Sequence, residues 1–109
     1  MVSESYGFVL TETAEADLDD TISYIANDLS NPDAASSFVE ELQRKTDEIR
    51  KRPKSGRPVE NDYLKRNDVR RFLVGNYIVY YFIDQEKRVI VILRLVYAGR
   101  DQDKILGKL

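Results

Sequence analysis

The chain has 109 residues, 42% of them hydrophobic and 33% charged, with a formal net charge of −2, a composition typical of one soluble globular domain. It contains no cysteine and no histidine, which excludes disulfides, thiolate or imidazole metal sites and histidine-activated nucleophiles. Since neither a membrane-spanning run of roughly 20 apolar residues nor a secretory signal is visible, we expect a single cytoplasmic domain over residues 1–109, without metal or cofactor.

The first half of the sequence predicts a short strand and two helices. Tyr6–Leu10 is the strand candidate. Thr11 then offers an N-cap, and apolar residues follow at helical spacing. The segment Ser30–Pro32 ends this helix and begins the next, with Asn31 as its N-cap and proline in its first turn. Pro53 ends the second helix. Because the link between them is so short, the two helices should form an antiparallel hairpin.

The second half predicts a loop followed by three strands. Residues 54–68 are polar and lack sustained periodicity, whereas apolar residues predict strands at about Val69–Val74, Tyr77–Ile83 and Arg88–Tyr97. Asp101–Leu106 adds a last helical turn. The order β-α-α-β-β-β indicates an α+β domain with the N-terminal helical hairpin packed on one face of an antiparallel sheet. Since the helices cover only one face, we expect the other face to be an open aromatic surface.

Charge is unevenly distributed along the chain. Residues 1–43 contain ten acidic residues and no Lys or Arg, whereas residues 44–71 contain eleven Lys or Arg against five acids. Acidic and basic faces could neutralise each other within the fold, or a basic surface could bind nucleic acid or an acidic protein. Tyrosines beside arginines suit RNA and protein partners equally. The pI of about 5.2 argues against strong non-specific DNA binding.

Four arginines stand in or beside the predicted strands. Arg94 interrupts an apolar run, where a guanidinium needs a carboxylate, a phosphate or water. It therefore belongs either to a binding site or to a structural ion pair, with Asp101 or with an acid of the first helix. Arg70 and Arg71 should point to opposite faces of their strand. One of them would then face a site and the other the acidic helices.

Several segments, taken in order, carry a family pattern. They are LTETAEADLDDTISYIANDLSNPDAASSF, PKSGR, VRRFLVGNYIVYYFID and VIVILRLVYAGRDQDKIL. Together they cover nearly the whole chain and resemble the RelE/ParE superfamily of toxins from type II toxin–antitoxin modules, which include plasmid-stabilisation (addiction) modules. The most specific parts are the helix junction at Ser30–Ala35, the motif Asn76-Tyr77-x-Val79-x-Tyr81, and Leu93-Arg94 followed by Gly99-Arg100-Asp101. The resemblance implies a β-α-α-β-β-β toxin neutralised by a cognate antitoxin that covers its functional face.

The resemblance leaves the target open. RelE-like members are ribosome-dependent mRNA endonucleases, ParE-like members inhibit DNA gyrase without being nucleases, and an inactive relic is a third alternative. Nuclease members commonly carry an arginine and a histidine where this chain has Ile78 and Val96, so whether the protein is an enzyme stays open. In a nuclease, Arg94 and Tyr97 would be the catalytic pair, stabilising phosphate charge and transferring a proton. The residues expected to bind phosphate or the target are Lys54, Arg57, Arg71 and Arg100.

Overall fold

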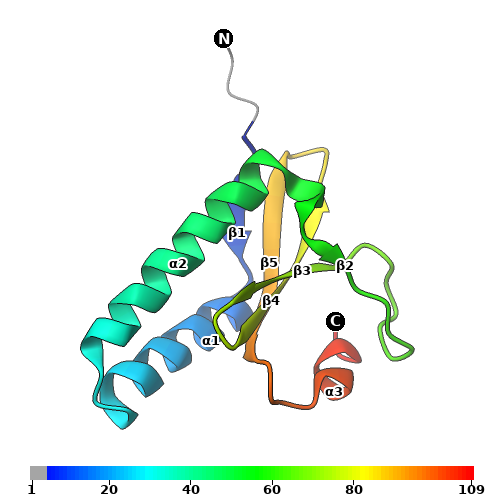
Figure 1. The fold of residues 1–109 in the computed structure, drawn as a ribbon. Coiled ribbons are helices and arrows are strands. Elements are labelled where there is room, and N and C mark those ends of the chain that lie inside the picture. Colours follow the sequence, from blue (N-terminus) through cyan, green and yellow to red (C-terminus); the bar gives the residue numbers. More distant parts are fainter. Residues whose placement is uncertain (1–4) are drawn as a thin grey trace.

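A five-stranded sheet carries two long helices on one face and a short helix on the other in the computed structural model, which describes residues 5–109 (Figure 1). The strands are β1 (Gly7–Leu10), β2 (Arg57–Pro58), β3 (Arg70–Val74), β4 (Tyr77–Asp84) and β5 (Val89–Tyr97), in the spatial order β1-β5-β4-β3-β2. The predicted α+β fold is confirmed. The sheet is mixed, because β1 pairs parallel with β5 after a long crossover while the other pairs are antiparallel.

Two helices form the predicted hairpin against the sheet. Helix α1 (Glu12–Ser23) begins after Thr11, whose Oγ1 accepts from the Ala14 amide at 3.1 Å, and continues into a π-helical turn, η1 (Tyr24–Asp28). Helix α2 (Pro32–Lys51) begins after Asn31, whose Oδ1 accepts from the Ala34 amide at 3.0 Å. Both predicted N-caps are confirmed. Within the described residues, no helix combines the length and the apolarity that crossing a membrane requires.

The remaining elements lie in the second half of the chain. The three predicted strands correspond to β3, β4 and β5, each within one residue at either end. The predicted loop contains a 3₁₀ turn, η2 (Pro53–Ser55), and the short edge strand β2. The predicted last helical turn is α3 (Gln102–Leu106), capped by Asp101, whose carboxylate accepts from the Lys104 amide at 3.3 Å.

The two faces of the sheet bury two separate apolar clusters. The main core fills the space between α1, α2 and the sheet, and it includes Ala14, Phe38, Ile49, Val79, Tyr81, Ile90, Ile92 and Leu95. The smaller cluster lies under α3 and consists of Val69, Ile78, Tyr80, Val96, Ile105 and Leu106. Tyr80 is only 1% exposed. The expected open aromatic surface is therefore wrong, because α3 covers the centre of that face with Ile105 and Leu106.

Candidate target-binding face

Three of the predicted arginines lie in one row across the sheet face that carries α3. The strand register pairs Arg57 with Arg71, Arg71 with Tyr80, and Tyr80 with Arg94, across β2, β3, β4 and β5. Residues directly opposite on neighbouring strands project to the same side, so the row places three guanidinium groups and a phenol on one face. The predicted positions Arg57, Arg71 and Arg94 thus belong to one surface.

Arg70 lies on the opposite face from Arg71, as the strand period predicts. Its Nη1 donates to the carbonyl oxygens of Lys54 at 3.0 Å and Gly56 at 2.7 Å. The expectation that this arginine would meet the acidic helices is wrong, because its guanidinium donates to these two loop carbonyls instead. Arg70 therefore holds the segment from Lys54 to Gly56 against β3 and is not part of the arginine row.

Arg94 forms an ion pair with Asp17 of α1. Its Nε donates to Asp17 Oδ2 at 2.7 Å and its Nη2 to Oδ1 at 3.1 Å, and the Leu95 amide donates to Oδ2 at 3.0 Å. The two side chains are only 16% and 13% exposed. Of the alternatives left open by the sequence, the structure shows the ion pair with an acid of the first helix. The charge of Arg94 is therefore already balanced within the protein.

Tyr80 and Gln102 connect α3 to the arginine row. Tyr80 Oη donates to Gln102 Oε1 at 2.7 Å, and Gln102 Nε2 donates to the carbonyls of Tyr97 at 3.2 Å and Arg100 at 3.0 Å. Burial raises the pKa of the Tyr80 hydroxyl, although the charge of nearby Arg71 opposes this shift. The phenol consequently stays protonated at neutral pH and remains a hydrogen-bond donor that holds α3 in place.

Helix α3 contributes side chains to two polar cavities. One, of about 350 Å³, is lined by Arg57 and Arg71 together with Tyr80, Gln102 and Glu60, among others. The other, of about 240 Å³, is lined by Arg94, Arg100, Asp101, Lys104, Ile105 and Lys108. Sequence reasoning missed Lys104 and Lys108. In the sequence, two lysines four residues apart indicate only an exposed surface, and their place beside Arg94 follows from the docking of α3. Among the described residues, no group of three or more His, Cys, Asp or Glu is placed to hold a metal ion.

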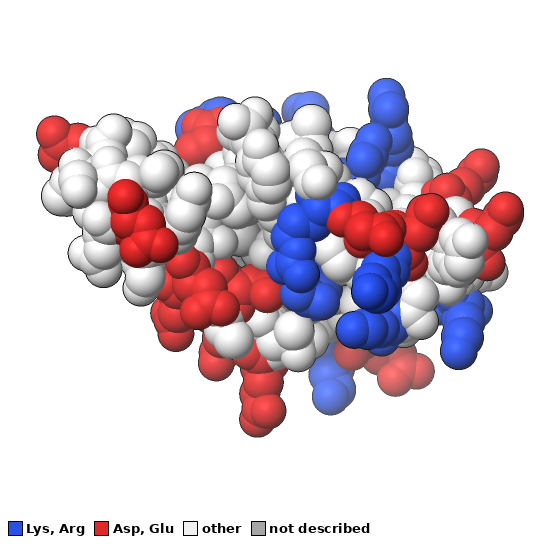
Figure 2. Space-filling model, turned by 90° about the horizontal axis from the view of Figure 1, so that it is seen from below, with Lys and Arg blue, Asp and Glu red and all other residues white. Residues whose placement is uncertain are grey.

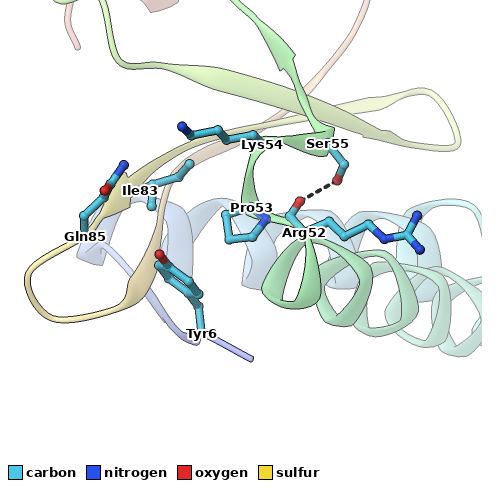
Figure 3. A pocket seen from close by; sticks show the side chains of 7 residues that line it. All are labelled: Tyr6, Arg52, Pro53, Lys54, Ser55, Ile83 and Gln85. Carbon is cyan, nitrogen blue, oxygen red and sulfur yellow. Dashed lines mark hydrogen bonds between the residues drawn. The ribbon is translucent and has the colours of Figure 1, made fainter. Parts of the chain in front are cut away.

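Lys54 lies apart from these cavities. It lines a cavity of about 430 Å³ together with Tyr6, Pro53 and Ile83. Figure 3 shows its side chain near Ile83 on one side of that cavity, while Ser55 donates to the Arg52 carbonyl at 2.7 Å. The structure therefore does not join Lys54 to the arginine row.

Tyr97 also lies apart from the arginine row. It is separated by one residue from Leu95, which belongs to the main core, and alternate residues of a strand share a face. Its ring meets that of Tyr77 edge-on at a centroid distance of 5.8 Å, and it is 50% exposed. Tyr97 thus belongs to an aromatic group on the hairpin face, on the other side of β5 from Arg94.

Comparison with known proteins identifies the family. Residues 8–102 match the model described as the ParE toxin of the type II toxin–antitoxin system, parDE. The chain belongs to the ParE toxin family. It is a toxin of a type II toxin–antitoxin module, in agreement with the resemblance predicted from the sequence. No curated protein matches the sequence.

Solved structures of similar fold come from the same group of toxins. The chromosomal ParDE system of P. aeruginosa superposes with a TM-score of 0.68 at 21% identity, covering 89% of this chain and 100% of that one. The toxin–antitoxin complex RelBE2 from Mycobacterium tuberculosis gives a TM-score of 0.60 at 23% identity, covering 85% and 98%. The isolated E. coli RelE toxin gives 0.60 at 16% identity, covering 96% and 100%. At these identities the likeness concerns the fold.

Removing the Gln102 side chain should loosen α3 in this ParE-family toxin. Gln102→Ala deletes the acceptor of the buried Tyr80 hydroxyl and the donor to three backbone carbonyls, which should cost about 1–3 kcal/mol. Amide exchange in α3 should accelerate, whereas exchange in α2 should change only with global stability. Gln85→Ala, on the β4–β5 turn, is the matched control and should leave α3 exchange unchanged. Equal protection of α3 in both variants would contradict this role for Gln102.

The buried phenols predict a loss of stability at alkaline pH. Burial raises the pKa of Tyr77, Tyr80 and Tyr81 above the ordinary value of 10.0. The folded state thus binds their protons more tightly than the unfolded state, so this stabilisation is complete below about pH 10 and is lost as pH rises through the folded-state pKa values. Urea unfolding between neutral pH and about pH 11 should show the decrease. Tyr80→Phe should make it shallower, and an unchanged slope would contradict the assignment.

Proposed function

We propose that this toxin arrests growth by binding DNA gyrase, without cutting mRNA, and that a cognate antitoxin neutralises it. The separation of Arg94 from Tyr97 carries the proposal. Cleavage of RNA needs a group that activates the 2′-hydroxyl, a charge that stabilises the phosphate and an acid for the leaving oxygen. The pair expected for this chemistry is divided between the two faces of the sheet, and Arg94 is paired with Asp17.

The residues at the two departures from the nuclease pattern support binding over hydrolysis. Ile78 and Val96 are 4% and 2% exposed and belong to the apolar cluster under α3. The two positions at which nuclease members carry charged side chains are apolar here, and they pack between α3 and the sheet. The face consequently offers exposed arginines and lysines around α3, and arginine is enriched at protein interfaces.

The structural neighbours support a cognate antitoxin. The ParDE system of P. aeruginosa and the RelBE2 complex of Mycobacterium tuberculosis are both toxin–antitoxin systems. A small reading frame adjoining this gene should encode the partner. Co-expression of that partner should restore growth and co-purify with the toxin, and failure of every adjoining frame to do so would contradict the assignment.

One observation favours the alternative, a ribosome-dependent mRNA endonuclease. Arg57 and Arg71 line a cavity beside the Tyr80 hydroxyl and Gln102. Two guanidinium groups and a phenol could bind a scissile phosphate there. No side chain in this cavity except Glu60 could act as a base, and the Tyr80 hydroxyl is committed to Gln102.

Two assays on the same induced protein separate the alternatives. Purified toxin should block supercoiling by gyrase in a dose-dependent manner, and mapping of mRNA 5′ ends after induction should show no new cleavage sites. Tyr97→Phe should inhibit supercoiling as the unaltered toxin does, because Tyr97 has no proton to transfer in this mechanism. Unimpaired supercoiling with new mRNA ends would favour the nuclease, and induction without growth arrest would favour the inactive relic.

A further inference from the structure

The cavity between β5 and α3 carries positive charge that the protein itself does not balance. Arg94, Arg100, Lys104 and Lys108 line it, together with a single carboxylate, Asp101. Asp17 balances Arg94. In the part of the chain that the structure describes, Arg100, Lys104 and Lys108 form no ion pair. All three are exposed at the cavity rim.

The one carboxylate in the cavity also caps α3. Asp101 accepts the Lys104 amide at 3.3 Å and keeps its negative charge, so one carboxylate faces three unpaired cations. Lys104 lies in α3 and Lys108 just beyond its end at Leu106, and both line the same cavity, where like charges repel. Holding three cations around one small polar cavity thus has an electrostatic cost, and an anion placed among them would remove it.

The charge distribution on the face drawn in Figure 2 favours an anion beside α3. Most of the blue side chains stand on the side where α3 lies, with red ones among them, and a separate red group lies over α1. An approaching polyanion is repelled by the acidic helix and attracted to the α3 side. A polyanion would therefore bind at the α3 side in a preferred orientation, even though the whole chain has a net charge of −2.

We propose that Arg100, Lys104 and Lys108 bind the phosphodiester backbone of duplex DNA. The proposal rests on the proposed function, since a toxin seated on gyrase lies next to the DNA that gyrase holds. The cavity lining contains no aromatic ring on which an unpaired base could stack, and Tyr97 lies on the other face. Contacts confined to phosphates suit a duplex better than single-stranded RNA, whose recognition relies on stacking.

Fluorescence anisotropy with a labelled DNA duplex tests this site without gyrase. The variant Lys104→Gln with Lys108→Gln removes two of the three cations. Lys45→Gln with Lys51→Gln, on α2, makes the same change in net charge away from the cavity. With about three phosphate contacts, affinity should fall about 40-fold between about 50 and about 200 mM salt for the unaltered toxin, and only about fourfold for the double variant.

The α2 control should keep the salt dependence of the unaltered toxin. Equal affinity and equal salt dependence in both double variants would overturn the proposal, as would tighter binding of a single-stranded RNA of the same sequence. Gyrase assays keep the two proposals apart. Inhibited supercoiling without lysine-dependent DNA binding would overturn only the DNA site, whereas lysine-dependent DNA binding without inhibition would overturn only the gyrase target.

Discussion

Asp17→Ala should lower the free energy of unfolding by about 3 kcal/mol, because it breaks a largely buried ion pair. The substitution leaves the Arg94 side chain, which is 16% exposed, without its carboxylate. It also removes the acceptor of the Leu95 amide. Because Arg94 also lines the cavity beside α3, some hydration is available to it, which places the expected effect at the lower end of the range for a broken buried pair. Urea unfolding measures the change.

Two further variants show whether the ion pair is the cause. Asp19→Ala removes an exposed carboxylate from the same helix and should change stability by less than about 0.5 kcal/mol. Asp17→Leu combined with Arg94→Met replaces both charges by apolar groups, and it should recover much of the stability lost by the single variant. If the double variant were as unstable as Asp17→Ala, loss of packing and not an unpaired charge would be responsible.

The features that the sequence predicted are those with local causes. The N-caps at Thr11 and Asn31 depend on residues three positions away, and the strands on alternation over a few residues. These interactions are encoded within a short stretch of chain, so their positions in the structure agree with the prediction.

The features that the sequence left open depend on contacts between distant residues. The carboxylate that pairs with Arg94 is 77 residues away. The residues of α3 are apolar enough to pack, but nothing local says which face of the sheet Ile105 and Leu106 will cover. That docking closes the face expected to be open, and it brings Lys104 into the cavity that Arg94 lines. The set of residues that line the cavity between β5 and α3 therefore depends on tertiary packing.

Gly56→Ala should destabilise the fold by about 2–4 kcal/mol, through overpacking and lost hydrogen bonds. A Cβ at this position would meet the Tyr81 hydroxyl oxygen and lie 2.7 Å from Cε1 of the same ring. Tyr81 is 0% exposed. Its hydroxyl donates to the Pro53 carbonyl at 2.6 Å and accepts from the Gly56 amide at 3.1 Å. Neither the ring nor the loop can move without breaking these bonds.

Gly56→Ala should also disturb the target-binding face, because Gly56 directly precedes Arg57 of β2. A shifted β2 would move Arg57 away from Arg71, so gyrase binding should weaken along with stability. Gly75→Ala is the matched control, since nothing lies within 4 Å of a Cβ there and only its φ of +56° opposes the substitution; it should cost about 1 kcal/mol. Tyr81→Phe combined with Gly56→Ala should cost less than the sum of the two single changes, because both disrupt the same contact. Additive losses in urea unfolding would mean that Gly56 is required for some reason other than the Tyr81 hydroxyl.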